Sequence, residues 1–320
     1  MQELKILASS RLIPPAVVQR FEAKHGIRIR FEYFESAEAL ASYLESRPSE
    51  DLALVRGHYI DDLKDKGQLA KLDHNLLPNL KNMDPTYIDS LPDPGCHYSV
   101  PYLVGNIGLI YRNDVLGRTQ PNLNQLFEPN TVTVPFSIMN QYRDAIGIAL
   151  KYLGYSYNST TIPQIEDAVD LLKSLGDRPS FIGFLSNDAT LRFLKEGITY
   201  VAMSYNNEAA KVIEEDPRMA FSTVEGGRVA WSYAHIISYK SEHLPEVHVW
   251  LNYLMEPEVA AEVSVWNLAT SPNLAAREFL PESVKNNPVL YPEGGVWEGA
   301  EIPGSVGDAG KTYVEYWHRL

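Results

Sequence analysis

The first third of the chain alternates between strand-like and helix-like patterns of apolar residues. Leu4–Ala8 are apolar apart from Lys5, which predicts a strand. Pro14 and Pro15 fit the start of a helix, where the fixed φ of proline and its missing N–H cost nothing, and Gly26 is placed to end that helix. Residues 27–33 alternate strictly between apolar and polar side chains, which predicts a strand with one polar face.

The same alternation of strands and helices continues beyond residue 33. We expect a helix over about Ala37–Glu45, a strand over Asp51–Val55, and a helix from about Tyr59 to Lys66. Such a succession predicts a mainly parallel sheet covered by helices. Leu72–Tyr98 is rich in Pro, Asn and Asp, and this composition is typical of a surface excursion.

Two long apolar segments, Val100–Tyr111 and Val229–Tyr239, have the length of strands that cross from one lobe to another. The other elements predicted from periodicity are strands over Thr131–Phe136 and Thr199–Tyr205, and helices over about Gln141–Leu153, Pro163–Leu175, Asn207–Glu215 and Pro245–Met255. The predicted fold class is therefore α/β, with two lobes joined by crossing strands. Each lobe is expected to hold a mixed, mostly parallel sheet flanked by helices.

Length and charge narrow the class of protein. A chain of 320 residues with 45% hydrophobic content buries a sizeable core and is long enough for two lobes. The formal net charge is −13 and no basic stripe is present, which argues against binding to nucleic acid. Val229–Ile237, among the longest apolar runs, is far shorter than the ~20 residues that cross a bilayer. We expect a soluble protein.

Signals of enzymatic chemistry are weak. Cys96 is the only cysteine and therefore forms no disulfide within the chain. Cys96 and His97 suggest a nucleophile and base, but their Pro-Gly-Cys-His setting indicates a turn, on which adjacency does not pair the two groups. His58, Asp61 and Asp62 suggest metal ligands, but acids are also favourable in a solvated first helical turn. Because no lipase-type serine elbow, phosphate-binding glycine loop or zinc-protease helix occurs, we expect no enzyme, no metal and no cofactor.

Polar residues follow two of the predicted strands at the point where each strand ends. Ser9, Ser10 and Arg11 come after the first strand, and Arg56-Gly57-His58 follows Leu52–Val55. In an open α/β sheet, ligands bind outside the carboxyl ends of the strands. The sequence therefore predicts that these junctions bind a small molecule.

Short stretches spread over nearly the whole chain resemble one family and occur in that family's order. They are Ile13-Pro14-Pro15, Asp51-Leu52, Tyr59, Leu72-Asp73, Ser99 to Tyr102, Gly105, Leu150 to Ser156, Glu196-Gly197, Ala202-Met203, Trp231, Ser271 to Arg277, Leu290 to Pro292 and Val306-Gly307. They are similar to the polyamine-binding members of the bacterial extracellular solute-binding proteins. These proteins are the spermidine/putrescine receptors of ABC importers.

The resemblance implies a periplasmic-binding-protein fold, in which two lobes joined by hinge strands close on a solute. The lobes are expected to be discontinuous, with 1–106 joined to 232–274 and 107–231 joined to 275–320. The family further implies a periplasmic monomer whose partner is an ABC permease of the inner membrane. No signal peptide is visible, because the chain enters a strand soon after Met1. This start fits a mature exported protein without its leader, and equally a cytosolic one.

The positions that align with the family's ligand pocket depart from its pattern. Ser9 and Arg11 stand where the family has tryptophan and glutamate, Arg56 replaces a serine, Gln141 and Tyr233 replace aspartates, Ala269 replaces a tyrosine and Pro303 a glutamine, whereas Trp231 is retained, Tyr205 keeps an aromatic ring and Asp144 keeps an acid. The pocket implied by the resemblance therefore loses acids and gains two arginines.

These exchanges favour a ligand with at least one anionic group. Two cations about 6 Å apart repel by roughly 3 kcal/mol at an effective dielectric constant near 20, whereas a guanidinium binds a carboxylate through paired hydrogen bonds. The retained acid favours a zwitterion, such as an amino-acid-like or opine-like carboxylate. The predicted ligand-binding residues are Ser9, Ser10, Arg11, Arg56, His58, Gln141, Arg143, Asp144, Tyr205, Trp231 and Tyr233, with Arg11, Arg56 and Arg143 as counter-charges beside the aromatic rings.

Other interpretations stay open. Arg11 or Arg56 alternatively pairs with a local acid, namely Asp144, Glu208 or Asp61. Arg143 alternatively points away from the ligand. With the arginines turned outward, the protein is expected to bind and transport a polyamine such as spermidine or putrescine. The same fold also serves as a periplasmic ligand sensor that partners a membrane signalling receptor, and nothing in the residues separates sensing from transport.

Overall fold

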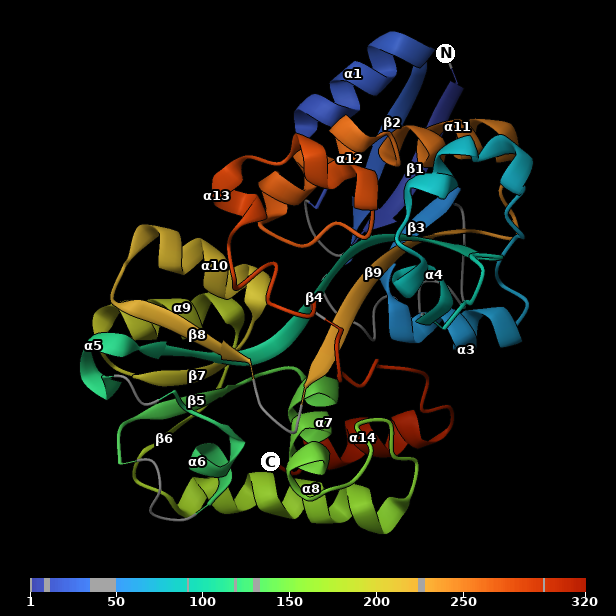
Figure 1. Ribbon diagram of the computed structural model, residues 1–320. Helices are drawn as coiled ribbons and strands as arrows, with labels where there is room; N and C mark the ends of the chain where they lie inside the picture. The colour runs from blue at the N-terminus through green and yellow to red at the C-terminus, as the bar shows by residue number, and fades with distance from the viewer. Residues whose placement is uncertain are drawn as a thin grey trace. The chain divides into compact units, whose positions relative to one another are not determined.

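The computed structural model describes residues 2–8, 12–34, 50–90, 92–117, 120–128, 133–223, 228–295 and 297–320. The chain forms two compact units, Met1–Val104 with Trp231–Asn287 (unit 1) and Gly105–Ala230 with Pro288–Leu320 (unit 2). The long strands β4 (Ser99–Arg112) and β9 (Val229–Ile237) belong in part to each unit (Figure 1). The lobe limits implied by the resemblance stay a prediction.

Unit 1 is built on a sheet with the strand order β2, β1, β3, β9. β1 (Gln2–Ala8) is parallel to β2 (Ile27–Tyr33) and β3 (Leu52–Arg56), and β9 is antiparallel to β3. The other elements of unit 1 are α1 (Pro15–His25), the 3₁₀ helices η1 (Gly57–Tyr59), η2 (His74–Leu76), η3 (Pro78–Asn82) and η5 (Leu274–Phe279), and α3 (Ile60–Asp65), α4 (Pro85–Ser90), α11 (Leu244–Leu254), α12 (Pro257–Asn267) and α13 (Glu282–Lys285).

The first strand-helix-strand succession follows the pattern of the sequence closely. Pro14 caps α1 and Pro15 is its first residue, while Gly26 ends the helix with a φ of 68° and donates its N–H to the carbonyl of Glu22. Glycine adopts this left-handed conformation without steric cost. In β2, Ile27 and Ile29 are buried and the arginines between them are exposed. The predicted helix limits and the predicted polar face of β2 are confirmed.

Aromatic side chains pack α1 against α11 in unit 1. The ring of Phe21 meets Trp250 edge to face, with centroids 4.7 Å apart, and lies 5.3 Å from the ring of Tyr253. The hydroxyl of Tyr253 donates to the carbonyl of Val17 at 3.1 Å. Buried aromatic side chains stabilise a core by their large apolar area, and a buried hydroxyl needs such a partner. These contacts hold the two helices together.

Unit 2 is built on the remaining strands. β7 (Val201–Tyr205) and β8 (Met219–Thr223) pair antiparallel with β4, and β5 (Phe136–Met139) pairs parallel with β7 and β6 (Phe181–Leu185). The other elements of unit 2 are α5 (Asn113–Leu116), α6 (Leu123–Phe127), α7 (Tyr142–Tyr152), α8 (Ile162–Ser174), the 3₁₀ helix η4 (Leu175–Asp177), α9 (Asn187–Glu196), α10 (Asn206–Glu215) and α14 (Ala309–Trp317).

Helix α7 packs against α8 and α14, and these two helices also contact each other. Figure 1 shows α7 running across the direction of α8 and α14. Almost every residue of α7 after Tyr142 is buried, including the charged pair Arg143 and Asp144 in its first turn. A charged group is buried in a folded protein only where hydrogen bonds or an opposite charge compensate for its lost hydration. The start of α7 is therefore one place in unit 2 where charged groups are held inside the protein.

Several elements differ from the predicted ones. The strand expected over Thr131–Phe136 begins only at Phe136, because Pro135 has no N–H to donate to a ladder. The predicted α/β fold is confirmed, but β4 and β9 introduce antiparallel pairs in both units. The helix expected over 37–45 lies outside the described residues. None of the described helices has the combination of length and apolar character that spanning a membrane requires.

Candidate functional site

The structure divides the predicted ligand-binding residues between the two units. Those of unit 1 are Arg56, His58, Trp231 and Tyr233, and those of unit 2 are Gln141, Arg143, Asp144 and Tyr205. Ser9, Ser10 and Arg11 lie outside the described residues, so the role of the first junction stays a prediction. The described members of each group lie at strand ends, helix starts or along β9.

In unit 1, an arginine and two aromatic rings come together on β3 and β9. Arg56 is the last residue of β3 and lies opposite Tyr233 in the antiparallel ladder. Opposite residues of such a ladder project to the same face of the sheet, and so does Trp231, two residues before Tyr233. The rings of Trp231 and Tyr233 meet edge to face with centroids 6.0 Å apart. Unit 1 therefore places two aromatic rings, of which that of Trp231 is buried, on the same face as the half-buried Arg56.

His58 follows Arg56 on the short helix η1, and its ring lies 4.2 Å from that of Tyr59. Asp61, one alternative partner for Arg56, instead accepts from Lys64 one turn further along α3, at 2.7 Å. Over the described ranges, no group of three or more His, Cys, Asp or Glu side chains is placed to hold a metal ion. His58 and Asp61 take part in local contacts at the start of α3.

In unit 2, the carboxylate of Asp144 is held by two tyrosine hydroxyls. Asp144 lies in the first turn of α7 and is 2% exposed. The hydroxyl of Tyr157 donates to Oδ1 at 2.6 Å, and the hydroxyl of Tyr205 donates to Oδ2. Hydrogen bonds to an ionised carboxylate are strong, and the dipole of the helix start also favours a negative charge here. The pair Asp144 and Tyr205, predicted as ligand-binding residues, is thus brought together.

The structure gives Arg143 a different environment from the one expected of a counter-charge for a ligand. Its Nη1 donates to the carbonyl of Tyr157 at 2.8 Å and its Nη2 to Oδ1 of Asn158 at 2.7 Å and to the carbonyl of Gly304 at 3.4 Å. The guanidinium also packs on the rings of Tyr157 and Tyr313, at 4.7 and 4.9 Å from their centroids. Arg143 therefore joins the helix start to two other segments of unit 2.

The remaining predicted residues of unit 2 flank helix starts. Gln141 directly precedes α7 and is exposed; its carbonyl accepts the N–H of Ala145 at 2.8 Å. Tyr205 ends β7 and precedes α10. The next residue, Asn206, is fully buried; its side chain accepts from the backbone N–H of Asn106 and donates to the carbonyl of Val289, both at 3.0 Å.

Tyr157 is the functional candidate that the sequence does not single out. It directly follows the stretch Leu150 to Ser156 that resembles the family, and it is fully buried in the turn after α7. A tyrosine in a polar turn is most simply a packing residue, and nothing local indicates that its hydroxyl bonds to a residue 13 positions earlier. Only the return of the chain onto α7 brings the two groups together.

Cys96 has the environment of a structural thiol. It is buried, and burial, reinforced by Asp93 and Asp89, raises the pKa of its thiol to about 12. A nucleophilic cysteine needs a lowered pKa and access to solvent. The structure therefore supports the turn interpretation of this segment.

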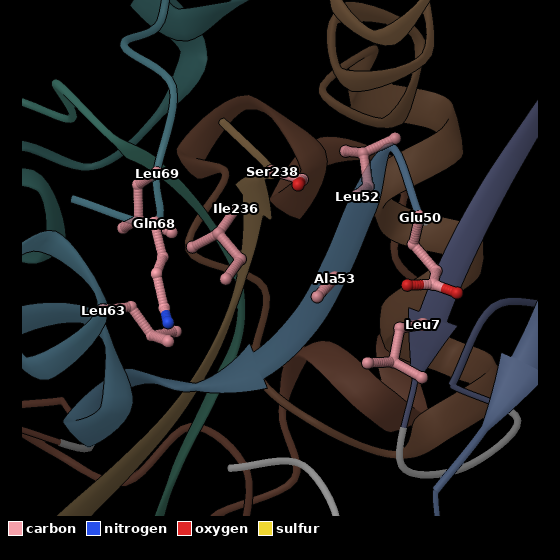
Figure 2. Close-up of a pocket in the computed structure, with 9 residues that line it drawn as sticks. All are labelled: Leu7, Glu50, Leu52, Ala53, Leu63, Gln68, Leu69, Ile236 and Ser238. Atoms are coloured by element: carbon pink, nitrogen blue, oxygen red, sulfur yellow. The ribbon is translucent and has the colours of Figure 1, made fainter. Parts of the chain in front are cut away.

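A small cavity in unit 1 lies apart from the predicted residues (Figure 2). Its lining is mostly apolar and consists of Leu7, Glu50, Leu52, Ala53, Leu63, Gln68, Leu69, Ile236 and Ser238. The cavity volume of about 10 Å³ is the room that a single water molecule needs. It is too small for a metabolite, and none of the predicted ligand-binding residues that the structure describes lines it.

Comparisons with known proteins bear on the chain as a whole. The chain matches the family model of bacterial extracellular solute-binding proteins over residues 16–291. The spermidine/putrescine-binding periplasmic protein of Salmonella typhimurium is 28% identical over 311 residues, which cover 96% of this chain and 88% of that protein. A solved structure described as a candidate spermidine/putrescine ABC transporter of Listeria monocytogenes has a TM-score of 0.89 and 26% identity, and the match covers 100% of this chain and 98% of that one.

A second solved structure extends the likeness in fold. The spermidine/putrescine ABC transporter substrate-binding protein of Streptococcus pneumoniae has a TM-score of 0.83 at 22% identity, with 99% of this chain and 100% of that one covered. At this identity the likeness concerns the fold alone. Together, the comparisons confirm the predicted resemblance and the fold class.

Proposed function

Because this chain belongs to the bacterial extracellular solute-binding proteins, we propose that it captures a polyamine such as spermidine or putrescine and delivers it to the permease of an ABC importer. Relatives described as binding spermidine and putrescine align with nearly the whole chain. They are described as periplasmic proteins, and we propose that this protein acts in the same compartment. We further propose that it is a monomer and that it binds its ligand without catalysing a reaction. We therefore propose a polyamine as the ligand, rather than the anionic ligand that the residue differences in the aligned pocket positions favoured.

The observation that carries the proposal is the carboxylate of Asp144, held in place beside the ring of Tyr205. An ammonium group binds well where a carboxylate supplies opposite charge and an aromatic face supplies a negative quadrupole. Trp231 and Tyr233 offer further rings from unit 1. The net charge of −13 adds a long-range field that attracts a cation rather than an anion.

The environment of Arg143 also supports an amine. An anion-binding arginine offers its N–H groups to the ligand, whereas both Nη atoms of Arg143 donate to groups of unit 2. Its guanidinium lies against two tyrosine rings. One of the three arginines expected to attract an anion is therefore engaged in holding the fold of its own unit.

Binding of spermidine and putrescine tests the proposal, with isothermal calorimetry and thermal unfolding as readouts. A ligand at a hundred times its dissociation constant stabilises the folded protein by about 2.7 kcal/mol, which is readily seen as a rise in Tm. We expect D144N to weaken polyamine binding by about thirtyfold, because a carboxylate that pairs with an ammonium contributes about 2 kcal/mol. Asp167, exposed and bonded to the hydroxyl of Tyr155 at 3.0 Å, provides the matched control D167N.

The proposal fails if the unmodified protein binds neither polyamine. The part that it gives to Asp144 fails if D144N binds polyamines as tightly as the unmodified protein and D167N do. A variant that is generally destabilised is recognised by a lower Tm in the absence of ligand.

A second candidate is an amine that also carries a carboxylate, such as an amino acid, an ω-amino acid or an opine-like compound. It is favoured by Arg56, half-buried at the carboxyl end of β3 and opposite Tyr233. In this case zwitterions raise the Tm of the protein and polyamines do not. R56A is then expected to abolish the rise in Tm with a zwitterion, and D144N to reduce it. A simple dicarboxylate that binds independently of Asp144 excludes both candidates.

A further inference from the structure

Tyr157 has an unusually constrained position in unit 2. It is fully buried in the turn after α7, and its side chain folds back onto that helix. Its hydroxyl donates to Oδ1 of Asp144 at 2.6 Å, while the other carboxylate oxygen accepts from the hydroxyl of Tyr205. Two phenol donors, one from the end of β7 and one from the turn, therefore determine the orientation of one carboxylate.

Arg143 holds Tyr157 from a second side. Its Nη1 donates to the carbonyl of Tyr157 at 2.8 Å, and its guanidinium carbon lies 4.7 Å from the centroid of the same ring. Its Nη2 donates to Oδ1 of the next residue, Asn158, at 2.7 Å. Arg143 and Asp144 are neighbours in the first turn of α7. Arg143 contacts the backbone and the ring of Tyr157, and the hydroxyl of Tyr157 donates to Asp144.

Gly147 makes room for the tyrosine ring. A Cβ atom at this position would lie 2.2 Å from Cε2 of Tyr157, 2.5 Å from Cδ2 and 2.6 Å from Cζ. These distances are far below van der Waals contact, and the target is a rigid, fully buried ring. Glycine inside a helix costs about 1 kcal/mol relative to alanine. A glycine one turn after Asp144 therefore lets the ring lie directly against the helix.

We infer that Tyr157 is a positioning residue for ligand binding: it presets the carboxylate of Asp144, and Gly147 and Arg143 hold it in place. The inference rests on the proposed function, in which Asp144 receives an ammonium group. A side chain that is already immobilised in its binding conformation loses less conformational entropy when the ligand arrives. Tyr157 thus acts on affinity through Asp144 and without a contact of its own to the ligand.

Tyr313 offers a matched control for Tyr157. It is also fully buried, its ring also packs on the guanidinium of Arg143, at 4.9 Å, and its hydroxyl also donates one hydrogen bond, to the carbonyl of Ser159 at 2.7 Å. It differs from Tyr157 in that its hydroxyl donates to a backbone carbonyl rather than to the carboxylate of Asp144. Y157F and Y313F each remove one buried hydroxyl, so we expect similar decreases in Tm without ligand.

The test is the dissociation constant of putrescine, measured by calorimetry for the full chain. We expect Y157F to weaken binding about three- to tenfold and Y313F to leave it within about twofold, because immobilising one side chain is worth about that factor. In a D144N background, Y157F is expected to have no further effect, since two residues that act through one another are not additive. A packing role for Tyr157 would weaken binding equally in both backgrounds.

Alanine substitutions at two glycines provide an independent arm. G147A is expected to displace the ring and weaken putrescine binding at least as much as Y157F, whereas G176A is a control with no atom within 4 Å of the new Cβ. Equal or tighter binding of putrescine by Y157F overturns the inference and leaves the proposed function intact. Absence of polyamine binding by the unmodified protein overturns the proposed function, and the inference with it.

Discussion

His235 is predicted to make the stability of the protein depend on pH. Its imidazole is 1% exposed, and neither ring nitrogen has a hydrogen-bond partner among the described residues. Its ring meets that of Tyr102 edge to face, with centroids 4.7 Å apart. Burial lowers the pKa of His235 from 6.5 to about 3, because a charged imidazolium is poorly solvated in an apolar interior.

The sign follows from comparing the folded and unfolded chains. The pKa is lower in the folded chain, so the unfolded chain binds a proton first as the pH falls, and protonation favours unfolding. Above pH 6.5 the ring is neutral in both states, so His235 does not lower the free energy of unfolding. As the pH falls from 6.5 toward 3, the free energy of unfolding decreases progressively. Between pH 7 and pH 5 these two pKa values correspond to a loss of about 2 kcal/mol in the free energy of unfolding.

The assay is urea unfolding, followed by circular dichroism at pH 7 and at pH 5. H235F keeps an aromatic ring beside Tyr102 and removes the titrating group, so it is expected to lose about 2 kcal/mol less than the unmodified protein over this interval. H97F, at an exposed histidine, serves as the control and is expected to follow the unmodified protein. Equal losses in the unmodified protein and in H235F would refute the reasoning.

Three further outcomes are expected. G108A should lower the free energy of unfolding by about 2 kcal/mol or more, since its Cβ would lie 2.3 Å from Cζ of Phe221. Urea unfolding measures this decrease, with G176A as the control variant. D93A should cost about 2–3 kcal/mol, because the buried carboxylate accepts two backbone N–H groups and a serine hydroxyl; a Tm within 1 °C of the original contradicts this. Cys96, with its pKa raised to about 12, should resist iodoacetamide at pH 8 until the protein is unfolded, as followed by mass spectrometry.

Local signals were sufficient for many of the elements. Pro14 and Gly26 mark the two ends of α1 because each residue has a backbone geometry suited to one end of a helix. The exposed arginines of β2 follow from strict alternation, since successive side chains of a strand point to opposite faces. The half-exposed strand β6 and the strand β8 lack such a pattern and escaped prediction.

The ligand chemistry depended on contacts that no local signal contains. Arg143 was expected to attract an anion, but its guanidinium donates to Asn158 and to the carbonyl of Gly304, 161 positions away in sequence. The sequence shows that a side chain is charged, but not which groups it pairs with in the folded protein. The comparison with curated relatives, rather than the charge of single positions, favours a polyamine.

The sequence by itself determined the α/β class and the limits of many elements, because backbone preferences and apolar periodicity act over a few neighbouring residues. The family followed from the resemblance of short stretches spread along the chain. Tertiary structure alone decided that Arg143 serves its own unit and that the hydroxyl of Tyr157 orients Asp144. Hydrogen bonds and ring contacts of this kind depend on positions to a fraction of an ångström, and those positions exist only after distant segments have packed together.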